Sequence, residues 1–485
     1  RLADRDRMLA VATPEFAKDL GQLSPAHLKR FARQITAEVA EQPSVMSNER
    51  IGDEISEMRV ARGTQSELEL KFRRIDDRWK LDDLQVESRR SGEGIASVRQ
   101  TMAAMVAALA FQDSYRASDK RRLKEVTTEK LYQGSLAAAD LSQVRLPGST
   151  DGQEEFDVRL EGAASTFIVK AGTEVLKISL VRQAAEQIHE TPVYLVEDVT
   201  IYELNGKEDK RLSALFTGQA TMTAFSAALA VRDLPGLRAH STHDFKARAW
   251  TPMKSDHFAR LPLAELQPVA PRIVQTDFKG SLLEILVEQG DTPLTYVLRD
   301  EGGRMLVDDV LVPATSRPES LKTNVELMLP FLEFIAALEH GTALQEQLAG
   351  AKSAPADAQE QTEIEILRGK STAEFSRLIW NHYQQIPEFD RDPLPHLQMP
   401  LSGINVAGDR AVLVLGNKRF GAEIRLQKER GEYRLDDVRL IFGPAKGQEI
   451  TMKKAIRQKL LDSRPPYEPT AVATKPDTNF RDSLE

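Results

Sequence analysis

The sequence predicts an α+β fold built from four tandem repeats of a helix-first domain with a curved antiparallel sheet. The main observation is a short motif, ending in two adjacent acids, that occurs four times along the 485 residues. The second acids of this motif follow one another at steps of 115, 111 and 128 residues. Such steps indicate a repeated domain, because the units of solenoid proteins are only about 20–50 residues long.

In each occurrence of the acid motif, an aromatic or large apolar residue leads into a short strand that carries the two acids. The four occurrences begin at Trp79, Tyr194, Met305 and Tyr433. The second acids of the four pairs are Asp83, Asp198, Asp309 and Asp437. Because neighbouring side chains of a strand point to opposite faces, we do not expect the two acids of a pair to act together on one substrate. An acid that every repeat needs is better explained by structure than by catalysis, so we expect these four carboxylates to hold loop amides or a neighbouring arginine.

A helical motif precedes the acids in the same order in each repeat. In the third repeat it consists of Leu237, Ser241-Thr242, Phe245 and Trp250, and in the fourth repeat, 130 residues later, of Leu367, Ser371-Thr372, Phe375 and Trp380. The second repeat has Thr127-Thr128 at this place, and we assign Ser24-Pro25 to it in the first repeat. A Ser or Thr ahead of a helical apolar spacing predicts a helix N-terminus, where proline is acceptable as the first helical residue.

Each repeat is expected to contain a long amphipathic helix, the capped helix, a proline and then three or four strands. Long helices are predicted at Ser97–Asp113, Leu212–Asp233 and Leu321–His340, and a last helix at Ile450–Leu461. Helices followed by strands with glycine turns predict antiparallel sheets rather than a parallel α/β sheet. The predicted domains are residues 1–92, 93–206, 207–318 and 319–463; the last has a leading helix at 320–348 and a flexible linker at 349–361, and residues 464–485 are a disordered tail.

The composition excludes several classes of site. The chain has no cysteine, which excludes disulfides, a thiol nucleophile and cysteine-ligated metal sites. The net charge of −8 and the lack of a basic stripe argue against binding to nucleic acid. No apolar run approaches the roughly 18–20 residues that a membrane-spanning helix needs, so we expect no transmembrane segment. The chain begins with Arg1 rather than methionine, which fits either the removal of a secretory signal or an artificial start of the chain. We favour an exported, periplasmic protein over a cytoplasmic one.

Helices followed by a curved antiparallel sheet, in domains of this length, resemble the nuclear transport factor 2-like superfamily of cone-shaped α+β domains. The strand that begins at Tyr433 is similar to the closing strand often seen there. That strand followed by a helix, up to Leu461, is also similar to periplasmic phospholipid carriers of the Mla type. The resemblance implies a cone-shaped fold that occurs in isomerases, dehydratases, ligand carriers and purely structural domains. It therefore implies no single activity. Enzymes of the superfamily use a lone pocket carboxylate of raised pKa as a base.

Two further groups of residues invite a functional interpretation. Histidines and acids that could suggest a metal gather in the third repeat: His240, His243, His257, Asp244 and Asp256. The aligned positions of the fourth repeat are Lys370, Ala373 and Pro387, so the cluster belongs to one repeat and we expect no metal site. Four aromatic residues could line a pocket, although they fit equally a core where helix meets sheet: Phe245, Trp250, Phe375 and Trp380.

The remaining motifs exclude most catalytic chemistry. No glycine-rich phosphate loop and no nucleophile elbow are present, so we assign no catalytic residue and expect no cofactor. The basic run at residues 120–124 is interpreted as a solvated helix face, with a patch for anionic lipid or an acidic partner as the alternative.

These observations favour a non-enzymatic binding or assembly protein of the bacterial envelope, with a protein partner or self-assembly. The repeats share framework positions but share no histidine, polar triad or metal set. Two alternatives stay open. One is a carrier of lipid or a small apolar ligand in the cone cavities, and the other is an isomerase- or dehydratase-like enzyme with one active repeat, for which the third is preferred.

Overall fold

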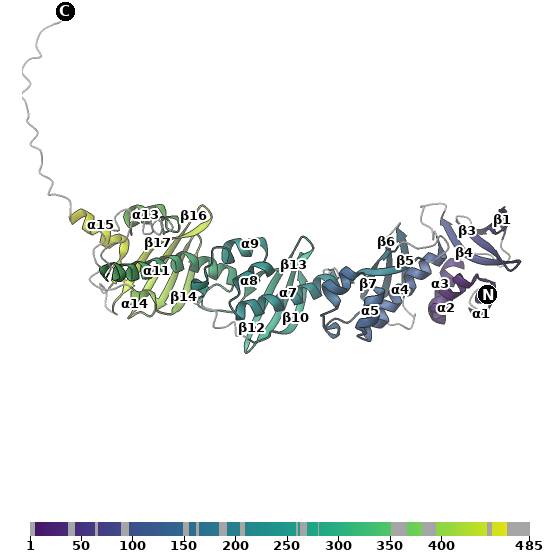
Figure 1. Ribbon diagram of the computed structural model, residues 1–485, viewed down its shortest axis with the longest axis horizontal. Coiled ribbons are helices and arrows are strands. Elements are labelled where there is room, and N and C mark those ends of the chain that lie inside the picture. Colours follow the sequence, from purple (N-terminus) through teal and green to yellow (C-terminus); the bar gives the residue numbers. More distant parts are fainter. Residues whose placement is uncertain are drawn as a thin grey trace, which may run out of the picture. The chain divides into compact units, whose positions relative to one another are not determined.

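The computed structural model describes residues 5–36, 44–63, 66–88, 97–148, 155–161, 164–183, 192–203, 209–258, 260–261, 269–279, 281–350, 365, 367–380, 394–443 and 449–462. In these ranges the fold contains four open antiparallel sheets, and helices precede the strands of each sheet in the sequence (Figure 1). The predicted α+β class with antiparallel sheets is therefore confirmed. No helix in these ranges is long and apolar enough to cross a bilayer.

Each sheet is a meander, in which strands that are consecutive in the sequence are neighbours. The first sheet contains β1 (Val45–Ile51), β2 (Ile55–Arg62), β3 (Ser66–Ile75) and β4 (Arg78–Ser88). The second contains β5 (Glu155–Glu161), β6 (Ala164–Ala171), β7 (Glu174–Arg182), β8 (Tyr194–Glu203) and β9 (Lys210–Arg211). The third contains β10 (Arg272–Lys279), β11 (Leu282–Gln289), β12 (Thr292–Glu301) and β13 (Arg304–Leu311). The fourth contains β14 (Leu401–Ala407), β15 (Arg410–Gly416), β16 (Gly421–Glu429), β17 (Glu432–Ile441) and β18 (Glu449–Thr451).

The helices come in groups ahead of the sheets. Before the first sheet lie α1 (Arg5–Val11), α2 (Pro14–Gln22) and α3 (Pro25–Thr36). Before the second lie α4 (Val98–Arg116), α5 (Lys120–Val126), α6 (Glu129–Leu131), the π-helix η1 (Tyr132–Leu136) and the 3₁₀ turn η2 (Leu141–Gln143). Before the third lie α7 (Leu212–Ala230), α8 (Leu234–His240), α9 (His243–Phe245), the π-helix η3 (Lys246–Trp250) and α10 (Ser255–Phe258). Around the fourth lie α11 (Leu321–Gly350), α13 (Ala373–Leu378), α14 (Leu394–Leu397) and α15 (Met452–Asp462).

The chain forms two compact units. The first comprises residues 1–244 and 268–309, and the second comprises residues 245–267 and 310–485. The first unit therefore holds the sheets β1–β4 and β5–β9 and most of β10–β13, and the second holds β14–β18. The predicted linker lies outside the described residues except for its first two residues, which belong to α11, and the predicted tail at 464–485 lies wholly outside them.

The long helices cover the sheets. In the first unit, α4 contacts β5, β6, β7 and β8, and α7 contacts β11 and β12. In the second unit, α11 contacts β17. Gly218 lets α7 approach its sheet closely, because a Cβ atom at this position would lie only 2.3 Å from Cδ2 of Leu283. Buried residues occupy several sides of α4 and α7, as is typical of helices that are enclosed rather than half-solvated.

Short parallel bridges connect the helical layer to the strand that carries each acid pair. They join Ala12 to Leu81, Thr127 to Val196, Ser241 to Val307 and Ser371 to Leu435. The bridge in the first sheet shows that the helical motif lies at Ala12-Thr13, so its assignment to Ser24-Pro25 is wrong by one helix. Ser24 instead begins α3, where its hydroxyl accepts a hydrogen bond from the backbone N–H of His27 at 3.3 Å. Ala12 lacks the hydroxyl that Thr127, Ser241 and Ser371 carry at the other three bridges.

Candidate functional site

The acid pairs of three sheets lie at β-bulges. The register of the closing strand against its neighbour shifts at Asp82, Glu197 and Asp436, which are the first acids of their pairs. A bulge sets two residues of one strand against one residue of the partner. The strict alternation assumed from the sequence therefore does not hold at these pairs. As a consequence, aliphatic residues three positions apart both face the core, as Val196 and Val199 do, each 0% exposed.

The first acid of a pair accepts a hydrogen bond from a threonine that begins a short helix. The Oγ1–Oδ1 distances are 2.9 Å for Thr13–Asp82, 2.8 Å for Thr242–Asp308 and 3.0 Å for Thr372–Asp436. The backbone N–H of the threonine also donates to the carbonyl that precedes the acid pair, at 2.8–2.9 Å, and Thr128 keeps this bond beside Glu197. These two bonds fix the capped helix to the closing strand.

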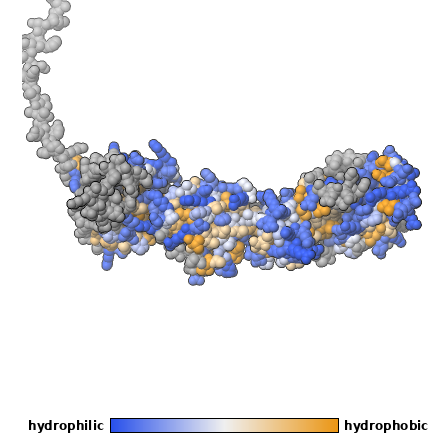
Figure 2. All heavy atoms as spheres, in the orientation of Figure 1, coloured by the Kyte–Doolittle hydropathy of each residue, from blue (hydrophilic) through white to orange (hydrophobic). Residues whose placement is uncertain are grey.

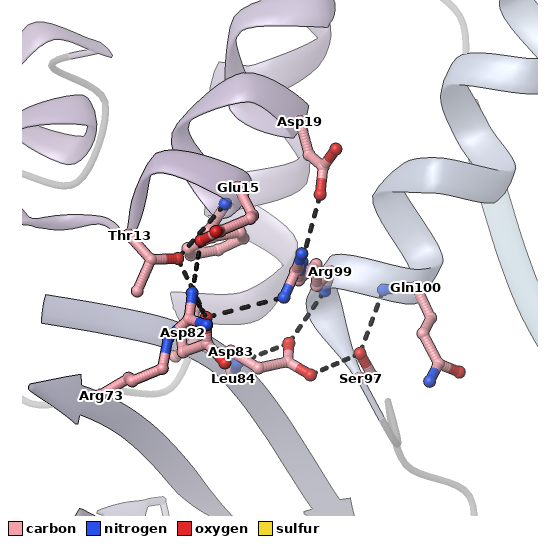
Figure 3. A network of polar contacts seen from close by, with 11 residues as sticks. Thr13, Glu15, Asp19, Arg73, Asp82, Asp83, Leu84, Ser97, Arg99 and Gln100 are labelled. Carbon is pink, nitrogen blue, oxygen red and sulfur yellow. Dashed lines mark hydrogen bonds and ion pairs between the residues drawn. The ribbon is translucent and has the colours of Figure 1, made fainter. Parts of the chain in front are cut away.

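The second acid of a pair caps the helix that leads to the next sheet. Asp83 accepts hydrogen bonds from the Ser97 hydroxyl at 2.5 Å and from the Arg99 N–H at 2.9 Å, both at the start of α4 (Figure 3). Asp198 accepts from the hydroxyl of Ser213 at 2.6 Å and from its N–H at 3.3 Å, at the start of α7. A carboxylate at a helix N-terminus satisfies unpaired amides and interacts favourably with the helix dipole.

The same cap is present at the start of the last helix. Asp437 accepts from the N–H of Lys453, in the first turn of α15, at 3.1 Å. It also accepts from the N–H of the next strand residue, Val438, at 2.9 Å, as Asp83 and Asp198 do from Leu84 and Val199. Asp309 occupies the corresponding place in β13, ahead of α11.

A basic residue at the second position of the capped helix completes two of these joints. At α4 the guanidinium of Arg99 lies 3.3 Å from Asp19 and 3.6 Å from Asp82, as Figure 3 shows. At α15 the Nζ atom of Lys453 lies 2.7 Å from both Asp436 and Glu374. Both basic side chains are buried, and the pair of Arg99 with Asp19 is shielded from solvent on both sides, whereas Glu374 beside Lys453 is 44% exposed.

Burial raises the pKa of two of the second acids, Asp83 and Asp437. The pKa of Asp83 is raised by burial, against the opposing effect of the hydrogen bonds from Ser97, Arg99 and Leu84. The pKa of Asp437 is raised by burial in the same way, against the N–H groups of Lys453 and Val438. A buried carboxyl of raised pKa can be a general base, but both oxygens of Asp83 and the Oδ1 atom of Asp437 already accept hydrogen bonds from the protein.

The four aromatic residues proposed as pocket lining lie in the core of the second unit. Phe245 and Trp250 are fully buried, with ring centroids 5.1 Å apart. Phe375 and Trp380 lie 5.7 Å apart, and the Trp380 Nε1–H donates to the Ser371 hydroxyl at 2.9 Å. These contacts are those of core anchors where the helices meet the sheet.

The histidines show no metal-binding geometry. His240 ends α8, His243 begins α9 and His257 lies in α10. Among the residues that the structure describes, no three His, Asp or Glu side chains converge on one point. Burial lowers the pKa of both His240 and His257, which favours their neutral forms.

The basic run at 120–124 is partly engaged within its own domain. Lys120 Nζ donates to the carbonyl of Ala139 at 2.6 Å and to that of Leu136, which lie beyond the end of α6. Arg121 is exposed and pairs with Glu125 one helical turn later. This arrangement is that of a helix cap beside a solvated face.

An apolar cavity of about 350 Å³ lies in the second unit, between α11 and the start of the sheet β14–β18. Its lining includes Met328, Phe331, Ile335, Leu397, Leu401 and Leu415. Arg260 and Gln398 also border it, and both bind Glu339, at 2.5 and 2.9 Å. The cavity thus has an apolar interior and a polar border of balanced charge. A second hollow of about 480 Å³ in the first unit is bordered by charged side chains such as Arg33, Glu155 and Lys170.

The sequence predicted the starts of the helices that receive the second acids to within two residues, but it did not predict that the second acids bind them. A signal for this contact exists: an apolar residue followed by a basic or hydroxyl residue lies 12–16 positions after each second acid. These pairs are Val98-Arg99, Leu212-Ser213, Leu321-Lys322 and Met452-Lys453. Comparison of the chain with protein-family models, with curated proteins and with solved structures gave no match.

Proposed function

We propose that the chain is a non-enzymatic assembly protein made of four tandem copies of one helix-first domain, each a distant variant of the nuclear transport factor 2-like cone. The observation that carries this proposal is the use of the second acid. Asp83, Asp198 and Asp437 each cap a helix that starts after their own sheet ends. Asp83 and Asp198 therefore each join a sheet to the helix that covers the next one, and a chain of joined copies is suited to holding several partners.

The burial of the sheets supports the same function. In the sheet β5–β9 the inward side chains of β7 and β8 are buried under α4, including Ile178 and Val196 at 0% exposure. In the sheet β14–β18 the equivalent residues Ile424 and Leu435 are at most 1% exposed. These parts of the two interiors are filled by the chain itself, which leaves the outer surfaces for binding partners.

Native mass spectrometry of the gently purified chain, followed by solvent extraction, tests this proposal. An assembly protein should give the mass of one chain or of a defined oligomer, with nothing extractable. A stoichiometric small molecule that extracts with solvent would contradict the proposal.

The cavity beside α11 favours a second candidate function, a carrier of a small apolar ligand. Its volume of about 350 Å³ falls in the range of small-molecule sites, which are mostly apolar with a few polar groups. A carrier should show an added mass that Leu401→Trp, which fills the cavity, abolishes. Leu461→Trp is the matched control, since Leu461 is 57% exposed on α15 and should leave the added mass unchanged.

A further inference from the structure

The cavity beside α11 has a buried apolar end and a half-exposed polar border. Its described lining belongs wholly to the second unit. Met328, Phe331 and Ile335 of α11 are at most 3% exposed. At the border, the side chains of Arg260 and its partner Glu339 are 35% and 30% exposed. A ligand would therefore direct its apolar part towards α11 and keep its polar part at the border.

The size of the cavity limits the ligand to one short chain. At about 30 Å³ for each heavy atom, the share that a water molecule has in the liquid, its volume of about 350 Å³ holds about a dozen heavy atoms. This suits a single chain of about ten carbons with a small head group, and it is too small for a lipid with two long acyl chains. The flexible side chains of Met328 and Met399 in the lining can adapt to such a chain.

The border carries two opposite charges that cancel. Nη2 of Arg260 donates to both carboxylate oxygens of Glu339, at 2.5 and 2.6 Å, and Nε2 of Gln398 donates to Oε1 of Glu339 at 2.9 Å. Burial acts to raise the pKa of Glu339, but the hydrogen bonds from Arg260 and Gln398 outweigh it and lower this pKa. The carboxylate is therefore ionised at neutral pH. A carboxylate head group would meet Glu339, and an ammonium head group would meet Arg260, so each would face a like charge.

The same border has hydrogen-bonding groups to offer to a ligand. Within the part of the chain that the structure describes, Oε1 of Gln398 accepts no hydrogen bond, and Nε and Nη1 of Arg260 donate none. Both side chains line the cavity. A hydroxyl or a primary amide can donate to the first group and accept from the others, whereas an ionised carboxylate only accepts and an ammonium only donates.

We infer that this cavity binds a single-chain amphiphile of about ten carbons with an uncharged head group that both donates and accepts hydrogen bonds, such as a hydroxyl or a primary amide. The inference rests on the second proposed function, the carrier, and names its class of ligand. Figure 2 shows hydrophilic and hydrophobic residues mixed on the surface where Figure 1 places α14 and β14, which agrees with a site for a molecule of both characters.

The test is calorimetric titration of the full chain with three probes of equal chain length: 1-decanol, decanoate and decylammonium. 1-Decanol should bind saturably at one site, at least about tenfold more tightly than either charged probe, because like charges brought together are strongly unfavourable. Leu401→Trp, which fills the cavity, should abolish this binding. Leu461→Trp is the matched control on the exposed side of α15 and should leave it unchanged.

Two variants of the border test the choice of head group directly. Glu339→Gln leaves the charge of Arg260 without its partner, so decanoate should gain at least about tenfold in affinity relative to 1-decanol. Arg260→Gln leaves the charge of Glu339, so decylammonium should gain instead. These opposite changes would not follow from a purely structural role of the pair. Both side chains are partly exposed, so we expect both variants to fold, which thermal unfolding verifies.

Four outcomes would overturn the inference. A natural chain that prefers decanoate or decylammonium, with binding that Leu401→Trp abolishes, would contradict the head group but keep the carrier function. Binding of 1-decanol that Leu401→Trp does not change would place the site elsewhere. Unchanged preferences in the two border variants would exclude the border as the cause of selectivity. Absence of binding by all three probes would contradict the inference and the carrier function together, and would leave the assembly function in place.

Discussion

The Oδ2 atom of Asp83 accepts a hydrogen bond of 2.5 Å from the hydroxyl of Ser97, which begins α4. Asp83 ends the acid pair of β4, whereas α4 covers the strands β5–β8. Ser97 in turn accepts from the N–H of Gln100 at 3.0 Å, so the carboxylate orients the residue that caps the helix. One side chain thereby ties the end of one sheet to the helix of the next.

Removal of this joint should loosen the first turn of α4. We expect Asp83→Ala to lower the free energy of unfolding by about 1–2 kcal/mol, because it leaves a buried amide and a hydroxyl without their acceptor. Hydrogen exchange at Arg99 and Gln100 should accelerate. Asp53→Ala is the control: its carboxylate is 95% exposed, its pair with Arg50 is on the surface, and no change is expected. Unchanged exchange at α4 in Asp83→Ala would contradict the capping role.

The raised pKa of Asp437 gives a pH dependence with a defined sign. Burial favours its protonated form in the folded state, so the unfolded chain loses its proton first as the pH rises above 3.8. Stability therefore falls between 3.8 and the folded-state pKa and is constant above it. Asp437→Asn does not titrate, so its stability relative to the natural chain should improve as the pH rises through this window.

Urea unfolding at several pH values, followed by the fluorescence of the buried Trp250 and Trp380, measures this dependence. Asp437→Ala should show the same change with pH but be less stable throughout by about 1 kcal/mol, since it also loses the cap. A relative stability of Asp437→Asn that worsens with rising pH would show that burial does not dominate at this site.

The close approach of α7 to its sheet can be tested by a single methyl group. Gly218→Ala should destabilise the first unit by about 1–3 kcal/mol, because the new Cβ atom collides with the buried Leu283. This loss exceeds the gain of up to about 1 kcal/mol in helix propensity. Gly134→Ala is the matched control, since nothing lies within 4 Å of its Cβ position. The midpoint of thermal unfolding should fall for Gly218→Ala. For Gly134→Ala it should stay unchanged or rise.

The threonine that binds the first acid should be needed for its hydroxyl rather than its shape. Thr372→Val loses the bonds to Asp436 and to the N–H of Phe375, at 3.0 and 3.2 Å, and should cost about 1–2 kcal/mol. Fluorescence of Trp380 reports the change, because its ring N–H bonds to the neighbouring Ser371. Thr323→Val in the first turn of α11 should shift stability by less than about 0.5 kcal/mol. Equal losses of stability in the two variants would contradict a stabilising role of the Thr372 hydroxyl.

The sequence predicted the fold class and most element positions, because strand alternation, glycine turns and helical spacing are local signals. The long helices predicted at Ser97–Asp113 and Leu212–Asp233, for example, lie at Val98–Arg116 and Leu212–Ala230, so each end is within three residues of its predicted position. The bulge at Asp82 was not predicted, although the spacing of Leu81 and Leu84 is three, which is incompatible with two core residues on a regular strand. Alternation was assumed where the apolar pattern itself departs from it.

The candidate site could be predicted only in part for a related reason. The repeated acids are visible in the sequence, but their partners Ser97 and Ser213 lie 14 and 15 residues further along the chain. Local patterns do not show which helix a carboxylate reaches. The shift of the first motif from Ser24 to Thr13 has the same origin, because both threonine and serine are good helix caps and Ala12 hides the doublet.

The bond between Asp83 and Ser97 means that neighbouring sheets do not unfold independently. When β4 unfolds, α4 loses its cap, and the sheet that α4 covers loses part of its own stability. Within the first unit, a damaging change in the sheet β1–β4 should therefore also lower the stability of the sheet β5–β9.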